Sequence, residues 1–142
     1  MTPTTHSLAS TLPHRQPDDP GARLLLFGIR QMGAHGLNDA ACAQAFLTAF
    51  GVDFRRPLIL LRTMMHEMSQ VAARPIQIAP WCCHRMTGGE ASLLTVLRRI
   101  DASPETARML LADLLGLRDA SSVAATAHLV AQAFADSGLP LR

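Results

Sequence analysis

The segment from Phe54 to Arg74 carries the longest helical periodicity in the chain. At about 100° per residue, its side chains separate into an apolar arc and a mostly polar arc that includes Arg62 and His66. An apolar arc this wide needs neighbours on several sides, so we expect a central helix over residues 57–74, with Arg62 and His66 turned away from the interior. Its expected apolar side consists of Leu58, Leu60, Leu61, Met64, Met65, Met68, Val71 and Ala72.

Five further helices are predicted from the same periodicity and from capping signals. Thr87 and Glu90 have the spacing of a capping box, and Asn38 is expected to cap the second helix. Leu47 and Leu110 are expected to face inward. The predicted ranges are 19–35, 39–50, 87–100, 103–115 and 121–137.

The remaining segments are predicted to be irregular. Residues 75–80 alternate like a strand, but prolines bound them and no second run offers a partner, so we expect an extended connector. Residues 1–19 are polar, rich in Pro, Thr and Ser, and lack periodicity, which indicates a mobile tail. The prediction is therefore an all-α protein, with residues 20–142 folded as a single compact bundle of about six helices.

Composition narrows the class of protein. The chain is 142 residues long, 49% hydrophobic and 17% charged, which is typical of one folded domain. No apolar run reaches the ~18 residues of a membrane span, and no leader is visible, so we expect no membrane partner. Three cysteines, an odd number, indicate reduced thiols in the cytoplasm. A net charge of +2 is too small to argue for nucleic acid, although all 13 basic residues are arginines.

The segment Trp81-Cys82-Cys83-His84-Arg85 concentrates reactive side chains just before a predicted helix start. A helix N-terminus lowers the pKa of a nearby thiol, so a reactive thiolate or a soft-metal site, such as zinc, is one interpretation. Zinc modules separate paired cysteines by two to four residues, whereas Cys82 and Cys83 are adjacent. The missing ligands would have to come from elsewhere, with His66 one candidate. The alternative interpretation is a structural turn with a partly buried thiol.

Catalytic motifs are not found. His66-Glu67 begins like a metalloprotease helix, but Gln70 stands where that motif needs its second histidine. No glycine-rich phosphate loop, no nucleophile elbow and no paired-carboxylate arrangement typical of acid–base catalysis is present. Arg55-Arg56 and Arg98-Arg99 are basic pairs, yet no predicted helix has a continuous basic face, so we do not expect a nucleic-acid partner.

Three stretches, PGARLLLFGIRQMGAHGLNDA, FRRPLILLRTMMHE and APWCCHRMTGGEASLL, together resemble a small family of uncharacterised alphaproteobacterial proteins, a domain of unknown function. The resemblance covers nearly the whole chain beyond the tail. It implies a bacterial cytoplasmic helical protein and no activity. It also implies a cysteine-rich turn at Trp81 to Arg85, where Trp81 is a departure that weakens a multi-thiolate ligand set.

The functional prediction is a non-enzymatic regulatory or protein-interaction module that offers an apolar groove to a partner or to a second copy. Arg62, His66, Trp81 and Arg85 are the candidate interaction residues. A thiol or metal site at Cys82, Cys83 and His84 is the first alternative, and a nucleic-acid-binding regulator is the second. We expect no catalytic residue and no cofactor apart from that possible metal ion.

Overall fold

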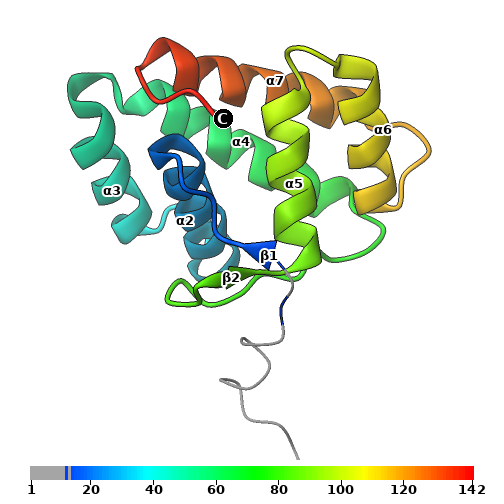
Figure 1. Cartoon of the computed structure of the whole chain (residues 1–142), viewed down its shortest axis with the longest axis horizontal. Coiled ribbons are helices and arrows are strands. Elements are labelled where there is room, and N and C mark those ends of the chain that lie inside the picture. The colour runs from blue at the N-terminus through cyan, green and yellow to red at the C-terminus, as the bar shows by residue number, and fades with distance from the viewer. Residues whose placement is uncertain (1–11, 13) are drawn as a thin grey trace, which may run out of the picture.

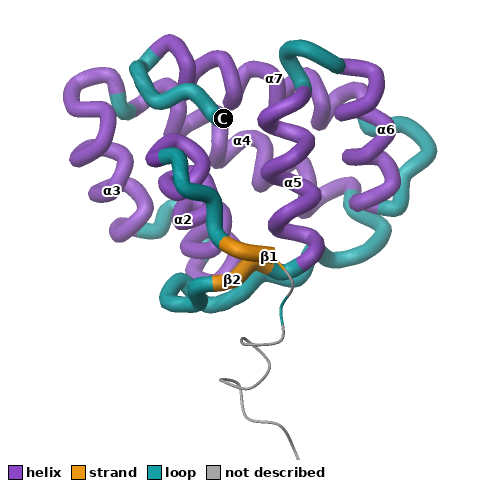
Figure 2. The backbone as a smooth tube through the Cα atoms, in the orientation of Figure 1, coloured by secondary structure: helices purple, strands orange, loops and turns teal. Residues whose placement is uncertain are grey.

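The computed structural model describes Leu12 and residues 14–142, and its elements carry the labels of Figure 1. The described part is helical apart from one short pair of strands, which confirms the predicted fold class (Figure 2). Its elements are β1 (His14–Arg15), α2 (Pro20–His35), α3 (Ala40–Phe50), η1 (Gly51–Asp53), α4 (Arg55–Val71), β2 (Arg85–Met86), α5 (Gly88–Arg99), α6 (Pro104–Leu115) and α7 (Ser121–Asp136).

Helix α4 lies at the centre, as predicted. It packs most extensively along α7 and also contacts α2 and α3, while α5 pairs with α6 on the other side of the molecule (Figure 1). Met64 and Met68 of α4 are buried, and His66 is exposed. Three phenylalanines join α3 to α7: the rings of Phe46 and Phe50 both meet Phe134 edge-on, at centroid distances of 5.8 and 5.2 Å.

Helix ends follow the local signals closely. Asp19 caps α2 by accepting from the Ala22 N–H at 3.0 Å, and Gly36, whose φ is 103°, is the C-terminal cap that follows His35. The cap of α3 is a correction, because Asp39 rather than Asn38 accepts from the Cys42 N–H, at 2.9 Å. The structure thus uses a carboxylate, which also suits the positive end of the helix dipole.

Some details of the predicted inward faces were wrong. The exposed fractions of Leu47, Val71 and Leu110 are 43%, 44% and 39%. The central helix also ends at Val71, because Ala72 has ψ 126° and turns the chain away. The Ala73 N–H then donates to the Leu115 carbonyl at 2.8 Å, which ties the start of the connector to the end of α6.

The two-stranded sheet was not predicted. Strands β1 and β2 are antiparallel, with His14 opposite Met86 and Arg15 opposite Arg85. The connector over residues 75–80 contains no strand, as expected. The predicted tail, residues 1–19, falls mostly outside the described residues, but its described end forms β1 and the cap of α2.

Candidate functional site

A buried ion pair links α2 to the start of α5. Arg30 and Glu90 expose only 2% and 1% of their surface, and the Arg30 Nε lies 2.7 Å from a Glu90 carboxylate oxygen. A second guanidinium nitrogen donates to the other carboxylate oxygen at 3.0 Å. This two-point geometry is the strong form of an arginine–carboxylate contact, and burial shields it from water.

The remaining Arg30 donors hold the turn that precedes α5. One guanidinium nitrogen donates to the Cys83 carbonyl at 2.9 Å, and another donates to the Arg85 carbonyl at 2.8 Å. The Gln16 amide also donates to the Cys83 carbonyl, so β1 is attached to the same turn. The backbone of the Trp81–Arg85 segment is therefore held by the guanidinium group of Arg30, a residue that is distant from this segment in the sequence.

Glu90 has a second role on the opposite side of the pair. Its carboxylate accepts from the Thr87 N–H at 2.9 Å, which completes the predicted capping box of α5. It also accepts from the Ala79 N–H in the connector, at 3.1 Å. The Thr87 hydroxyl donates to the Gln77 carbonyl at 2.6 Å. The connector is thus held to the helix by hydrogen bonds at two alternate residues.

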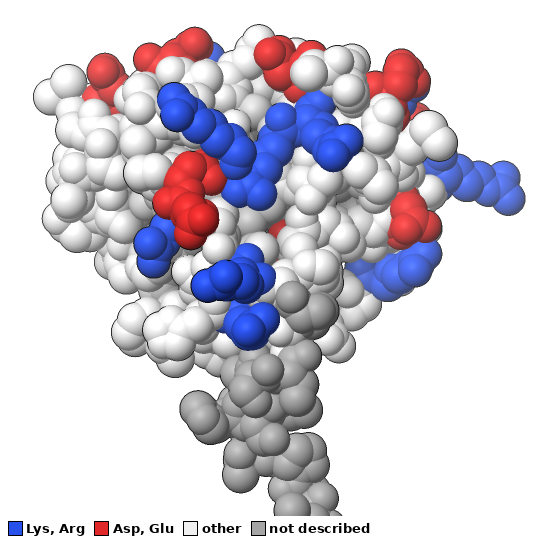
Figure 3. All heavy atoms as spheres, viewed as in Figure 1, with Lys and Arg blue, Asp and Glu red and all other residues white. Residues whose placement is uncertain are grey.

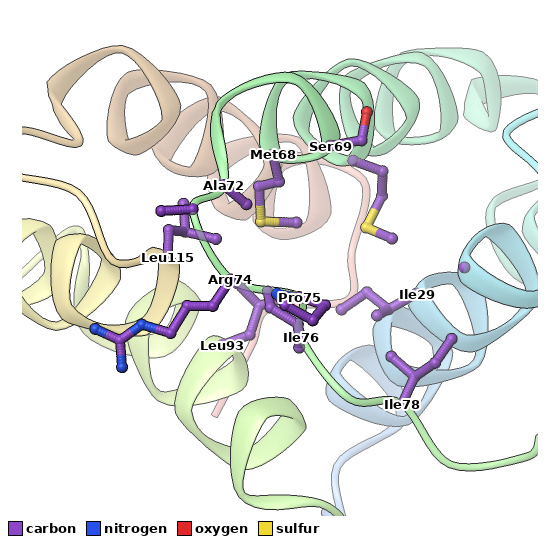
Figure 4. Close-up of a pocket in the computed structure, with 13 residues that line it drawn as sticks. Ile29, Met68, Ser69, Ala72, Arg74, Pro75, Ile76, Ile78, Leu93 and Leu115 are labelled. Atoms are coloured by element: carbon purple, nitrogen blue, oxygen red, sulfur yellow. The ribbon is translucent and has the colours of Figure 1, made fainter.

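The connector forms one wall of an apolar cavity of about 490 Å³. Helices α2, α4, α5 and α6 form the remaining walls, and Figure 4 shows Ile29, Met68, Ile76 and Leu93 around it. The complete lining is Ile29, Gly33, Met65, Met68, Ser69, Ala72, Ala73, Arg74, Pro75, Ile76, Ile78, Leu93 and Leu115.

Two glycines let this wall approach the helices. A Cβ on Gly33 of α2 would lie 2.3 Å from the Ile78 Cδ1 atom, and a Cβ on Gly89 of α5 would lie 2.9 Å from the Ile76 Cγ2 atom. Neither distance is compatible with a methyl group unless the isoleucine moves. The close neighbour of Gly33 is therefore the connector rather than another helix.

The polar side chains in the cavity lining are those of Ser69 and Arg74. The Ser69 hydroxyl donates to the His66 carbonyl at 2.6 Å, within its own helix. Arg74 is exposed and takes part in none of the ion pairs between described residues. Its guanidinium extends past Leu115, away from Ile29, so the charge lies at the rim rather than inside (Figure 4).

Comparison with known proteins identifies a family. The profile of a family of unknown function, DUF6628, matches residues 3–131, which is most of the chain. The chain belongs to DUF6628. This confirms the resemblance to a domain of unknown function. No curated protein and no solved structure matches the chain. Among the described residues, no helix combines the length and hydropathy of a membrane span.

The sequence-predicted metal candidates do not form a cluster in this DUF6628 chain. Cys82 and His84 are exposed, Cys83 is buried, and His66 lies on the exposed side of α4. Within Leu12 and residues 14–142, no three His, Cys, Asp or Glu side chains come close enough to hold a metal ion together. The backbone of Cys83 is engaged on both sides: its N–H donates to the Pro80 carbonyl at 3.0 Å, and its carbonyl accepts from Gln16 and Arg30, which indicates a structural turn.

The candidate interaction residues of the DUF6628 chain have separate local environments. Arg62 is half-buried and donates to the Leu37 carbonyl at 2.9 Å, so it connects α4 to the loop after α2. Trp81 is 64% exposed on the turn. Arg85 is half-buried in β2 and donates to the Leu12 carbonyl at 3.3 Å.

Proposed function

We propose that this chain is a small non-enzymatic binding module, and that its site is the cavity between the connector and helices α2, α4, α5 and α6. The observation that carries the proposal is a volume of about 490 Å³ with a nearly all-aliphatic lining. Small-molecule sites measure roughly 300–1,000 Å³ and are mostly apolar. The occupant proposed is a small, mainly aliphatic molecule.

Binding rather than reaction is proposed because the lining offers little chemistry. Ser69 has no neighbouring base in the lining, and its hydroxyl already donates within α4. An activated serine requires a base within hydrogen-bond reach. The lining does offer two methionines, Met65 and Met68, whose flexible side chains adapt to occupants of different shape.

A small molecule fits better than the protein partner or second copy expected from the sequence. A helix that docks in a groove needs an extended apolar surface. Among the described residues, the exposed large apolar side chains are instead spread over separate elements, with no helix contributing more than two: Leu47, Val52, Ile59, Val71, Trp81, Met109, Leu110 and Leu129.

The test uses Nile red, a neutral apolar dye that fluoresces on leaving water, and its displacement by 1-decanol. Ala72 lines the cavity and is half-buried, so Ala72→Leu places three extra carbon atoms there. Ala125→Leu is the matched control, because Ala125 is exposed on α7 and outside the lining. We expect about one dye per chain, an affinity about tenfold weaker in Ala72→Leu, and no change in Ala125→Leu.

The Tm of Ala72→Leu is expected to change in the opposite direction to its affinity for the dye. Filling a cavity commonly stabilises a protein, so Ala72→Leu is expected to raise the Tm while it weakens dye binding. A wild-type chain that leaves the dye dark, or an Ala72→Leu chain that binds the dye as tightly as the wild type, would show that the cavity is not a binding site.

A further inference from the structure

A second cleft, separate from the apolar cavity, is basic. It has a volume of about 320 Å³ and lies where β1 meets β2 and the start of α2. Figure 3 shows arginine side chains gathered on the face that carries these strands. The cleft is lined by Arg15, Gln16, Pro17, Asp18, Arg23, His84 and Arg85.

The two strands place like charges directly opposite each other. Arg15 and Arg85 are cross-strand partners in the antiparallel pair. Opposite residues lie on the same side of a ladder, with Cβ atoms about 4.5–5.5 Å apart, and like charges there are destabilising. Arg15, Arg23 and Arg85 take part in none of the ion pairs between described residues. No carboxylate among the described residues therefore lies within ion-pair distance of these three guanidinium groups.

Charge counting indicates the class of ligand. Three guanidinium groups, from Arg15, Arg23 and Arg85, share the cleft with one carboxylate, that of Asp18, which leaves two positive charges unbalanced. His84 lies in the same cleft and adds a further charge when it is protonated. A phosphate monoester carries about two negative charges near neutral pH. Guanidinium groups also match the geometry of phosphate oxygens in a two-point contact.

The backbone beneath these arginines is held in place. Arg30 donates to the Arg85 carbonyl at 2.8 Å, and Arg30 and Gln16 both donate to the Cys83 carbonyl. These bonds fix β2 and its turn before any ligand arrives. A site held in this way loses less conformational freedom on binding than a flexible one.

We propose that this cleft binds a phosphate-type dianion between Arg15 and Arg85, either as inorganic phosphate or as the phosphate group of a small monoester. The ligand would lie in the cleft that both arginines line and offset their like charges, while one Arg85 nitrogen keeps its hydrogen bond to the Leu12 carbonyl. This inference is independent of the proposed aliphatic cavity, which the basic residues do not line.

The experiment titrates the full chain with inorganic phosphate and with glycerol 1-phosphate by calorimetry, at constant ionic strength. Arg15→Gln and Arg85→Gln are each expected to weaken binding about tenfold, as for the loss of a charge-assisted contact. Arg118→Gln is the matched control, because this substitution also removes one positive charge, but Arg118 lines a different cleft. Its affinity is expected to equal that of the wild type.

In Arg15→Glu, the Tm and the affinity for phosphate are expected to change in opposite directions. It would place a carboxylate opposite Arg85, so the Tm without phosphate is expected to rise while phosphate binding disappears. Tighter binding of glycerol 1-phosphate than of phosphate would identify an ester as the ligand, and equal affinity would identify the free ion. The proposal is overturned if the wild type binds neither, if Arg118→Gln loses as much affinity as Arg15→Gln, or if Arg15→Glu lowers the Tm.

Discussion

Replacing Arg30 by methionine tests how much the buried ion pair contributes to stability. Methionine keeps an unbranched side chain of similar length, so the main loss is electrostatic rather than steric. Four hydrogen bonds disappear, two to the Glu90 carboxylate and one each to the carbonyls of Cys83 and Arg85. Glu90 keeps two backbone N–H donors but no positive partner. Removing one member of a buried pair costs about 3–5 kcal/mol, and we expect Arg30→Met to fall in that range.

Urea unfolding followed by circular dichroism measures this change, and the slope against urea should stay constant if only the folded state is affected. The control is Arg56→Met, which breaks the ion pair with Asp136, whose two side chains are 51% and 62% exposed. Exposed pairs contribute about 0–1 kcal/mol, so this variant should remain close to the wild type. If Arg30→Met and Arg56→Met lost the same free energy, within about 1 kcal/mol, the assigned role of the buried pair would be wrong.

Two other predictions concern a thiol and a turn. Burial raises the pKa of the Cys42 thiol from 9.0 to about 11, with Asp39 adding to the effect. The unfolded chain therefore loses this proton first, and stability should fall by about 2–3 kcal/mol between pH 9 and 11. The chain has no lysine or tyrosine to titrate in that window, and Cys42→Ala should remove this contribution to the pH dependence in urea unfolding. Gly116→Ala should cost about 1–2 kcal/mol in the same assay, because Gly116 is left-handed, with φ 71° and ψ 33°. A Cβ there would also lie 2.8 Å from the Arg74 Nε atom, so a Gly116→Ala chain as stable as the wild type would contradict the reasoning.

The helices were predictable because their signals are local. The apolar arc of α4, the Asp19 cap, the Thr87–Glu90 box and the glycine stop at Gly116 each involve residues within a turn or two of one another. Such signals can be identified from neighbouring residues without knowing what packs elsewhere. The misplaced inward positions, such as Leu47, depend on which neighbours a helix has, and periodicity alone does not specify this.

The buried ion pair between Arg30 and Glu90 was not predictable, because its two members are far apart in the sequence. Arg30 follows Leu26 by one helical turn on the buried side of α2, and its partner lies 60 residues away. Glu90 already had a sufficient local role as a capping residue, so nothing in the sequence required a second one. Strands β1 and β2 have two residues each, too few to show alternation. One signal was available: an arginine in an otherwise apolar arc requires a buried partner.

The ion pair also supports the walls of both the aliphatic cavity and the basic cleft. The Glu90 carboxylate holds the connector through the Ala79 N–H, and the connector is a wall of the aliphatic cavity. The Arg30 guanidinium holds the carbonyls of Cys83 and Arg85, which support the basic cleft. Each wall is therefore attached by hydrogen bonds to a buried charge, in addition to the packing of Ile76 and Ile78 against the helices. These hydrogen bonds do not depend on an occupant of the cavity, so they hold the wall in the position that an occupant would meet.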